Sequence, residues 1–557
     1  MIPLRALAAP ATLPEAQPST RLEPWGIARG PELPRRREHA ALLVGTFAAA
    51  LFAAAYLIAA PPSADLAAAT YRAQTFSRAG LVLWDNAWYG GHDLLAYSVL
   101  APALSALLGA RMLIALSAVI AAALFATIAE ALFTSRAALL ASVWFAVGLG
   151  AELLAGRVPY VLGLTFGLAS LLAFQRKHLW AAVVLACASS LASPLAGGFL
   201  ALAALAIAFA DRRAVALAAS ALAPIALFAV AFPEGGYEPF AASAFWPEFA
   251  GLALLAIAVP RGWRMLRAGV VLYLMLELGA YVLHTPVGGN AERLGALFAG
   301  PLMAGALWER RRALLIVLAP LLLYWQVATP LGDLVKVSSD ASVPAAYYRP
   351  LAAEVGRLSA GVPVRVEIPM TGAHWESSLV EAAASRRGYG IVLARGWERQ
   401  LDTRYATLFY RSSVGAAAYR AWLEEDAVSY VALPNVRLDE SALAEATLIR
   451  RGLPYLREVW RNPDWRLFAV LGARPLAATP AQMTSVGVDS FALHAPAAGA
   501  YVVRLRFSPY WKLSAGRGCV REASGGWTTV QARSAGAIRV GIAFSLARIF
   551  EHGARCN

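Results

Sequence analysis

The stretch HAALLVGTFAAALFAAAYLIAAPPSAD, residues 39–65, decides the fold class of this chain. From His39 to Ala60 it carries no acidic or strongly basic residue, and an apolar run of about 20 residues is long enough to cross a bilayer as a helix. Pro61-Pro62 ends the run, and Asp65 follows three positions later. The stretch therefore predicts an uncleaved first span, with a carboxylate just beyond its end.

Composition extends this interpretation to more than half of the chain. The 557 residues are 59% hydrophobic and 15% charged, with a mean hydropathy of +0.55, which exceeds the apolar content of a soluble globular protein. Apolar runs crowd residues 39–330, whereas residues 331–557 have ordinary polarity. The net charge of +14 comes largely from short basic clusters between apolar runs, so we expect a lipid bilayer and no nucleic acid as partner.

These basic clusters also predict the topology. Cytoplasmic loops are enriched in Lys and Arg, and two apolar passes fit between successive clusters. Residues 39–330 are thus expected to make about eleven spans, with the N-terminus in the cytoplasm and the C-terminus outside the plasma membrane. The two passes within residues 178–210 have only about 16 residues each, so a re-entrant pair is an open alternative there. The clusters are Arg35-Arg36-Arg37, Arg136, Arg176-Lys177, Arg212-Arg213, Arg261 to Arg267 and Arg310-Arg311-Arg312.

The remaining segments suggest four domains in all. Residues 1–38, rich in Pro, Arg and Ala, are predicted to be a disordered cytoplasmic tail. Residues 331–472 alternate helical patterns with short apolar strands, which favours an α/β domain. Residues 473–557 contain strand-like segments between Gly and Pro turns, which favours a small β-sandwich. A disulfide between Cys519 and Cys556 in this part fits an oxidising, extracytoplasmic compartment.

The first outer loop, residues 61–98, concentrates groups that can do chemistry. The candidate catalytic residues are Asp65, Asp85 and His92, because a carboxylate or imidazole can take a proton from a sugar hydroxyl. Four aromatic residues of this loop are candidates for sugar binding: Trp84, Trp88, Tyr89 and Tyr97. The alternatives are an interfacial aromatic belt for the rings, a helix cap for Asp65, and a structural role for His92.

Other outer segments add a possible phosphate site and an acceptor site. Arginine binds phosphate with paired hydrogen bonds, so the donor-phosphate candidates are Arg157, Arg293, Asn290 and His284. The further candidates for acceptor or sugar binding are Glu234, Trp375, Glu376, Arg395 and Trp397. Both arginines also suit contacts with lipid headgroups, and the last four residues also suit a surface ion-pair cluster.

The arrangement resembles the GT-C superfamily of polytopic membrane glycosyltransferases, which use polyprenyl-phosphate sugars. The likeness lies in Asp65 after the first span, in Trp84-Asp85 and Trp88 to His92 of the long first outer loop, and in the many-helix core with a C-terminal domain. It implies that Asp65, with Asp85 as second candidate, acts as base or metal ligand. No Asp-Glu pair directly follows the first span, and the C-terminal part lacks Trp-Trp-Asp, which argues against an oligosaccharyltransferase. The segments around Arg157 and Asn290 to Arg293 also resemble actinobacterial membrane proteins.

The resemblance leads to a specific expectation of function. The protein would transfer a sugar from a polyprenyl-phosphate donor to a glycan, lipid or protein acceptor of the cell envelope. A transporter or flippase of lipid-linked sugars, or a non-catalytic scaffold for envelope assembly, is the alternative. The cofactor is left open, with a divalent cation as one option. Zinc-type Cys and His spacing, a phosphate-binding loop and a serine nucleophile elbow are absent from the sequence.

Overall fold

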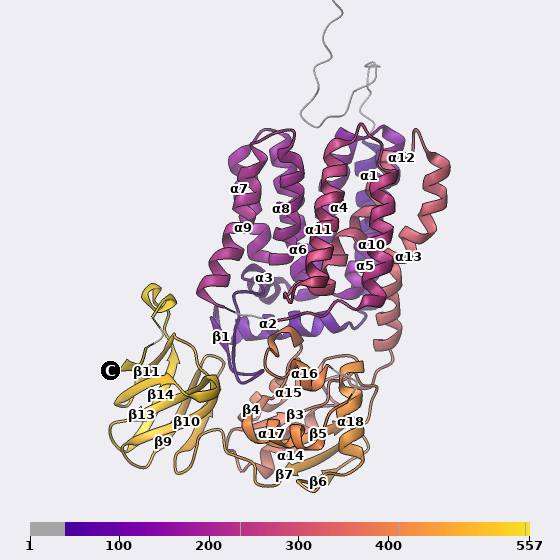
Figure 1. Ribbon diagram of the computed structural model, residues 1–557. Helices are drawn as coiled ribbons and strands as arrows, with labels where there is room; N and C mark the ends of the chain where they lie inside the picture. The colour runs from indigo at the N-terminus through magenta and orange to yellow at the C-terminus, as the bar shows by residue number, and fades with distance from the viewer. Residues whose placement is uncertain (1–38, 234–235, 411–412, 552, 557) are drawn as a thin grey trace, which may run out of the picture.

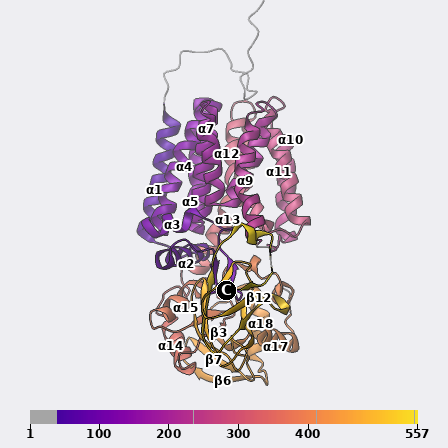
Figure 2. The same ribbon diagram turned by 90° about the vertical axis from the view of Figure 1, so that its left-hand side faces the viewer.

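The computed structural model describes residues 39–557 except 234–235, 411–412, 552 and 557, and it has three parts (Figure 1). A layer of long helices lies at one end, and an α/β module and a β module lie side by side at the other. The segment from α2 to β2 lies between the layer and the two modules (Figures 1 and 2). The predicted tail 1–38 and the candidate Glu234 fall outside the described residues.

The apolar runs of the sequence form the helices of the helical layer. Seven helices among the described residues are long and apolar enough to cross a membrane, and three shorter apolar helices accompany them. The layer therefore supports a membrane protein with several spans, whereas the number eleven stays a prediction. The seven are α1 (Ala40–Ala59), α4 (Ala110–Leu132), α5 (Ser135–Ala155), α6 (Val158–Gln175), α9 (Ala214–Ala231), α11 (Arg264–Val282) and α13 (Arg312–Val337). The shorter ones are α7 (Leu179–Ala192), α8 (Pro194–Ala208) and α10 (Ala242–Ala258), and α12 (Glu292–Leu307) lies among them.

The turn residues of the sequence become the ends of these helices. Gly156 ends α5 in a left-handed conformation, with a φ of 75° that favours glycine. Ser193 accepts a hydrogen bond from the backbone N–H of Ala196 at the start of α8, and Pro194 occupies the first turn, where its missing N–H costs nothing. Gly163 allows α6 to approach α8, because a Cβ at this position would lie 2.8 Å from that of Ala196.

The described ends of the layer differ in charge. Thr134, between α4 and α5, donates a 2.7 Å hydrogen bond to Glu309, between α12 and α13, so these two connections lie at the same end. Arg136 in the first turn of α5 and the cluster Arg310-Arg311-Arg312 lie at or beside these connections. Figure 1 shows that this end is the one away from the two modules. These two basic clusters therefore lie opposite the modules, and the side of the membrane on which they lie stays a prediction.

The amphipathic helix α2 (Ala64–Ala79) lies across the other end of the layer (Figure 1). After it come the short strands β1 (Trp84–Asp85) and β2 (His92–Asp93), which pair antiparallel, and then α3 (Leu100–Leu108). The turn between the two strands contacts both modules. Ala87 O accepts from Leu393 N of the α/β module at 2.8 Å, and Asn86 N donates to Val488 O of the β module at 2.8 Å.

The α/β module is built on a five-stranded sheet of order β4-β3-β5-β7-β6. Strands β4, β3 and β5 are parallel, and β7 and β6 continue the sheet antiparallel. The strands are β3 (Val364–Glu367), β4 (Ile391–Leu393), β5 (Val428–Pro434), β6 (Leu456–Arg461) and β7 (Trp465–Val470). The helices are α14 (Arg349–Leu358), α15 (Glu376–Ser385), α16 (Ala406–Phe409), α17 (Ala416–Glu425) and α18 (Leu443–Arg450).

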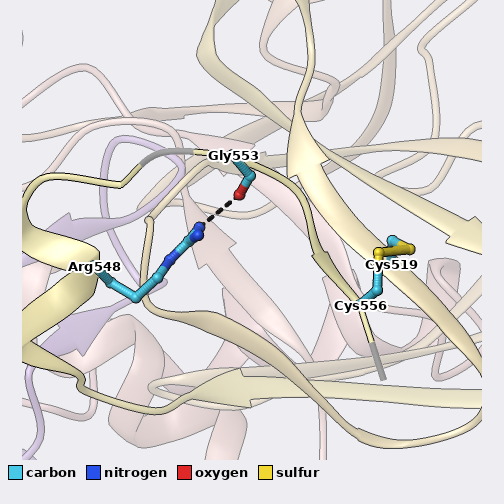
Figure 3. Close-up of a disulfide and its surroundings, with 4 residues drawn as sticks. All are labelled: Cys519, Arg548, Gly553 and Cys556. Carbon is cyan, nitrogen blue, oxygen red and sulfur yellow. Dashed lines mark hydrogen bonds between the residues drawn. A yellow bond between two sulfur atoms is a disulfide. The ribbon is translucent and has the colours of Figure 1, made fainter.

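The β module consists of two four-stranded sheets, of order β10-β13-β12-β15 and β11-β14-β9-β8. Their inward residues, among them Phe491, Trp511 and Val530, form one buried core. A disulfide joins Cys519 on β12 to Cys556 on β15 (Figure 3). The strands are β8 (Gln482–Val486), β9 (Ser490–Ala495), β10 (Gly499–Arg506), β11 (Trp511–Ala515), β12 (Gly518–Glu522), β13 (Trp527–Ala532), β14 (Gly536–Ile542) and β15 (Arg555–Cys556).

Candidate active site at the end of the helical layer

Asp65 lies between two arginines that come from different helices of the layer. It occupies the first turn of α2, directly after the Pro61-Pro62 break, and its side chain is 21% exposed. Its Oδ2 atom is 3.2 Å from Nε of Arg157 and 3.9 Å from a terminal nitrogen of Arg293. Three residues far apart in the sequence thus form one charged group, which we call the boundary cluster.

Arg157 is the centre of the boundary cluster. It precedes α6, and its Nη1 atom lies 3.2 Å from Oε1 of Glu152 at the end of α5. Burial lowers the pKa of Arg157, but the carboxylates of Glu152 and Asp65 outweigh burial and raise it overall. The guanidinium therefore keeps its charge and makes hydrogen bonds to two acids.

A narrow cavity adjoins the boundary cluster. Its polar wall is formed by Glu152, Arg157, Glu292 and Arg293. Trp325 and Gln326 of the helix α13 also line it. Its free space holds about one water molecule. Arg293 also lies over the ring of Tyr160, with 5.8 Å between its guanidinium carbon and the ring centroid. The cavity is thus a polar hollow with two guanidinium groups at its wall.

The chemistry of the boundary cluster suits an anionic ligand. Two arginines can bind the oxygens of a phosphate group with charge-assisted hydrogen bonds. A carboxylate next to them can accept a proton from a hydroxyl group. A phosphate that took over the two guanidinium groups would release the Asp65 carboxylate from these partners, and its oxygens could then accept a hydrogen bond from a hydroxyl group. Within the described residues, three or more His, Cys, Asp or Glu side chains are nowhere grouped to hold a metal ion.

Asp85 lies away from the boundary cluster. Its side chain is fully buried, and it accepts hydrogen bonds from the hydroxyl of Tyr71 at 2.6 Å and from the N–H of Ala87 at 2.9 Å. Burial raises the pKa of Asp85 to about 6. An acceptor hydroxyl cannot reach this carboxylate in the present conformation. The interpretation of Asp85 as a second candidate base is therefore corrected: its contacts are structural.

His92 is also interior. Its ring lies 3.2 Å from a terminal nitrogen of Arg72 and stacks on Trp88 with an interplanar angle of 6°. Burial and the nearby Arg72 both lower the pKa of His92, so the imidazole is neutral. Arg72 in turn donates a 2.6 Å hydrogen bond to Glu398 of the α/β module. His92 therefore belongs to the contact between α2 and the modules, not to the boundary cluster.

The aromatic rings of the first outer loop are covered by protein. Trp88 is fully buried, stacks on Tyr71 and donates to Ser377 O at 3.2 Å. Tyr89 donates to Gly396 O at 2.7 Å, and Trp84 packs edge-on against Trp511 of the β module. These three rings hold the loop on the modules. The prediction of sugar binding is corrected for Trp84 and Trp88, which are covered by protein, whereas Tyr89 lines a separate cleft described below. Tyr97 differs because it is only half-buried, with Arg72 over its ring at 5.6 Å.

The remaining donor-phosphate candidates do not line the cavity. His284 is exposed at the end of α11, and its ring packs on Tyr237 with 4.6 Å between centroids. Asn290 lies in the short helix η1 (Gly288–Ala291), which precedes α12. Of the four predicted phosphate ligands, the structure brings Arg157 and Arg293 together and leaves His284 and Asn290 outside.

The candidates in the α/β module are largely interior as well. Trp375 and Glu376 are buried, and Glu376 accepts a 2.6 Å hydrogen bond from the Thr371 hydroxyl. Arg395 is buried between Glu367 and Glu445 and forms ion pairs with both. Trp397 is half-buried beside His374. An exposed ion-pair cluster is therefore the wrong description for this region, although Arg395 lines a separate cleft described below.

Several residues of the site were not predicted. Gln326 is a polar residue inside the apolar run of α13, and Arg72 is a basic residue inside the Ala-rich α2. In both places a polar side chain interrupts an apolar pattern, and this interruption could have marked the residue as a candidate. The partner of Arg72, Glu398, carries no such signal because it lies in a polar segment 326 residues later.

The function has to be interpreted from the geometry described above. No protein-family model matches the sequence, and no curated protein matches it. The resemblance to GT-C glycosyltransferases therefore rests on the sequence features alone.

Proposed function

We propose that this protein is a membrane glycosyltransferase that transfers a sugar from a polyprenyl-phosphate donor to an extracytoplasmic acceptor. The supporting observation is the boundary cluster: Asp65 lies within 4 Å of both Arg157 and Arg293, at the end of the helical layer. A lipid-linked phosphate would lie at this level, because its polyprenyl chain occupies the membrane. The cluster supplies both a base and a phosphate site there.

The proposed reaction is a single displacement at the anomeric carbon. The acceptor hydroxyl gives its proton to the Asp65 carboxylate while its oxygen forms a bond to the anomeric carbon. The bond between that carbon and the donor phosphate oxygen breaks, and its electron pair leaves with the phosphate. Arg157 and Arg293 stabilise the charge of the departing polyprenyl phosphate. Asp65 then releases the proton to water, and the sugar is left with inverted configuration.

Transport of a lipid-linked sugar is the second candidate, and Glu277 is the observation that favours it. This α11 residue is fully buried, and neither carboxylate oxygen has a hydrogen-bond partner among the described residues. Ionisable groups inside a membrane commonly mark a translocation path. Glu277, however, lies five residues before the end of α11 at Val282, a depth of roughly 8 Å. Glu277 therefore lies about one helical turn from the middle of α11, where transport sites are expected. Glycosyl transfer is the better supported function because the boundary cluster combines a carboxylate with two arginines.

The test is sugar transfer by purified protein in nanodiscs, with a polyprenyl-phosphate sugar as donor. We expect Asp65→Asn to reduce the transfer rate by about 10²- to 10⁴-fold, because the amide cannot accept the hydroxyl proton. Glu440→Gln is the control, since this exposed carboxylate belongs to the α/β module and does not line the cavity at the boundary cluster. Transfer by Asp65→Asn at the wild-type rate would exclude Asp65 as the base. Donor flipping without any transfer would favour the transport candidate.

A further inference from the structure

A second, larger cavity lies at the meeting point of the first outer loop and both modules. We call it the junction cleft, and its volume is about 250 Å³. Tyr89 and His92 reach it from the loop, Arg395 and Asp402 from the α/β module, and Arg506 from the β module. Because three parts of the chain form its walls, the cleft exists only in the assembled protein.

Two buried charged groups in the cleft wall have unused hydrogen-bonding capacity. Asp402 is 5% exposed, and its Oδ1 accepts from the N–H of Tyr405 at 3.1 Å, whereas Oδ2 has no partner among the described residues. Arg395 is also 5% exposed, and in the described part of the chain its Nη1 likewise has no partner, although its other nitrogens pair with Glu367 and Glu445. Buried polar atoms without partners are rare in native structures and call for an explanation. These two atoms have almost no exposed surface of their own, so a ligand in the cleft would reach them through a small movement of side chains in the wall.

These groups are complementary to hydroxyl groups. A carboxylate only accepts hydrogen bonds and a guanidinium only donates them, whereas a hydroxyl group does both. A hydroxyl can therefore satisfy Asp402 and Arg395 together. The overall charge also favours a neutral ligand, because the three acids of the wall balance its three arginines. The acids are Asp402, Asp426 and Glu522, and the arginines are Arg395, Arg404 and Arg506.

We propose that the junction cleft binds a neutral oligosaccharide, through hydroxyl contacts with Asp402 and Arg395 and ring contacts with Tyr405 and Phe507. Both rings are half-buried in the cleft wall, so each presents part of its apolar surface to the cavity. Rings of this kind pack on the C–H faces of sugars while the polar wall binds the hydroxyls. This proposal rests on the proposed function and identifies the acceptor as a glycan held outside the helical layer.

The helix α2 relates this cleft to the boundary cluster. Arg72 of α2 contacts His92 of the cleft wall at 3.2 Å, and Asp65 lies seven residues earlier on the same helix. Seven residues of helix span roughly 10 Å. The end of a short glycan held in the cleft could therefore reach Asp65, the proposed base.

The experiment measures binding of neutral pentose and hexose tetrasaccharides to the full-length protein in nanodiscs, with a sulfated tetrasaccharide alongside. We expect Asp402→Asn to raise the Kd of the neutral ligand about 10- to 100-fold, because a charge-assisted acceptor is lost. Tyr405→Ala and Phe507→Ala test the rings without touching buried charge. Glu440→Gln, an exposed carboxylate of the same module outside the cleft, is the matched control and should bind as wild type.

Three outcomes would overturn the cleft proposal: no neutral tetrasaccharide binds the folded protein, only the sulfated one binds, or all cleft variants bind like Glu440→Gln. Asp65→Asn separates the two proposals, since it should lose transfer and keep oligosaccharide binding. If Asp65→Asn transfers normally while the cleft variants lose binding, the assigned base is wrong and the glycan site stands.

A different surface, the connection between β14 and β15, carries a second inference. Its residues 543–551 contain the short helix η5 (Leu546–Ile549), and the connection rises from the β module toward the helical layer (Figure 1). The connection is attached at its base. Arg548 donates to Gly553 O at 2.7 Å (Figure 3) and to Pro509 O at 2.9 Å.

One side of this connection packs on the end of a predicted span. Ile549 contacts an apolar cluster that includes Ala231 and Phe232 at the end of α9, together with Tyr510. Tyr510 donates a 2.5 Å hydrogen bond to Ala231 O. The other side carries two exposed apolar side chains, since Leu546 is 73% exposed and Phe550 is 79% exposed. Large apolar side chains at the level where a span ends are adjacent to the lipid surface.

We infer that Leu546 and Phe550 insert into the boundary region of the lipid leaflet next to α9. An apolar side chain gains free energy by leaving water for this region, and Arg548 beside them suits lipid phosphates. The β module would then rest on the membrane as well as on the first outer loop. This inference does not depend on the proposed function.

A nitroxide label placed by Leu546→Cys in nanodiscs of phosphatidylglycerol and phosphatidylcholine tests this inference, with Cys187 replaced by Ala. We expect higher collision with oxygen and lower collision with a water-soluble nickel chelate than for a label at Ala498→Cys. Ala498 is exposed in the turn after β9. The end of β9 pairs with the start of β14, so this turn lies at the end of the sheet opposite the connection that carries Leu546. Equal nickel accessibility at both positions would overturn the inference.

Discussion

The boundary cluster and the junction cleft use charge in opposite ways. At the boundary, Asp65 and Glu152 are already bound by Arg157, and little free space remains. In the cleft wall, Asp402 and Arg395 each keep one atom without a partner among the described residues, beside a cavity of about 250 Å³. A ligand at the boundary must therefore replace an existing ion pair, whereas a ligand in the cleft can add hydrogen bonds to a formed site. We infer that donor binding rearranges the boundary cluster and that acceptor binding changes the cleft little.

The largest effect is expected from Arg157→Gln. This change removes the partner of both Asp65 and Glu152 and one of the two proposed phosphate ligands. We expect the transfer rate to fall by about 10³-fold, in the range found when a group that stabilises transition-state charge is removed. The measurement is sugar transfer in nanodiscs at saturating donor. A fall of less than tenfold would mean that the boundary cluster does not bind the phosphate.

The next effect concerns the ion pair between Arg72 and Glu398, which joins α2 to the α/β module. Both side chains are buried, with exposed fractions of 4% and 3%. Arg72→Met leaves the Glu398 charge buried and unpaired, which costs about 3–5 kcal/mol. We expect a lower Tm in detergent, largely restored by the double variant Arg72→Met, Glu398→Leu. A double variant as unstable as the single one would show that the loss comes from packing.

A smaller effect is expected from the pH dependence of the cleft. Burial raises the pKa of Asp402 to about 6 from its ordinary value of 3.8. The folded protein therefore binds more protons than the unfolded chain between these values, and its stability falls as pH rises through this window. Asp402→Asn should be more stable than wild type by up to about 3 kcal/mol above pH 6 and equal to it below pH 3.8. Unfolding measured at pH 3.5 and pH 7.5 tests this, and an equal difference at both values would contradict it.

The smallest effect is expected from Arg78→Met. Arg78 makes a 2.6 Å ion pair with Glu381 of α15, and this pair, like that of Arg72 and Glu398, joins α2 to the α/β module. The Arg78 side chain is 38% exposed, so water already solvates much of its charge. We expect a loss below about 1 kcal/mol and unchanged transfer. A loss as large as that of Arg72→Met would mean that burial does not explain the difference between the two pairs.

The sequence predicted the parts of the fold that depend on local pattern. The run from His39 to Ala60 became α1. The short apolar strands expected within residues 331–472 include β5 and β7. Strands β4 and β15 were not predicted, because three or two residues carry too little periodicity to be recognised, and β6, β8, β11 and β12 were not predicted either.

The candidate site was only partly predictable, because the sequence grouped its members only by the side of the membrane on which they are expected. That criterion correctly grouped Asp65, Arg157 and Arg293. It could not separate Asp65 from Asp85, since the burial of Asp85 depends on a loop that packs against segments 300 to 400 residues away in sequence. Trp88 contacts Ser377, and Asn86 contacts Ser490. A single sequence holds no signal for such pairings.

The position of α2 has a consequence for how this chain could be re-engineered. One end of the helix carries Asp65, and its middle is bound to the α/β module through Arg72. Replacing residues 340–557 with the corresponding part of another protein would therefore shift the carboxylate as well as the cleft wall. If the proposed function is correct, altered substrate preference is better sought by point changes in the cleft wall than by exchange of whole domains.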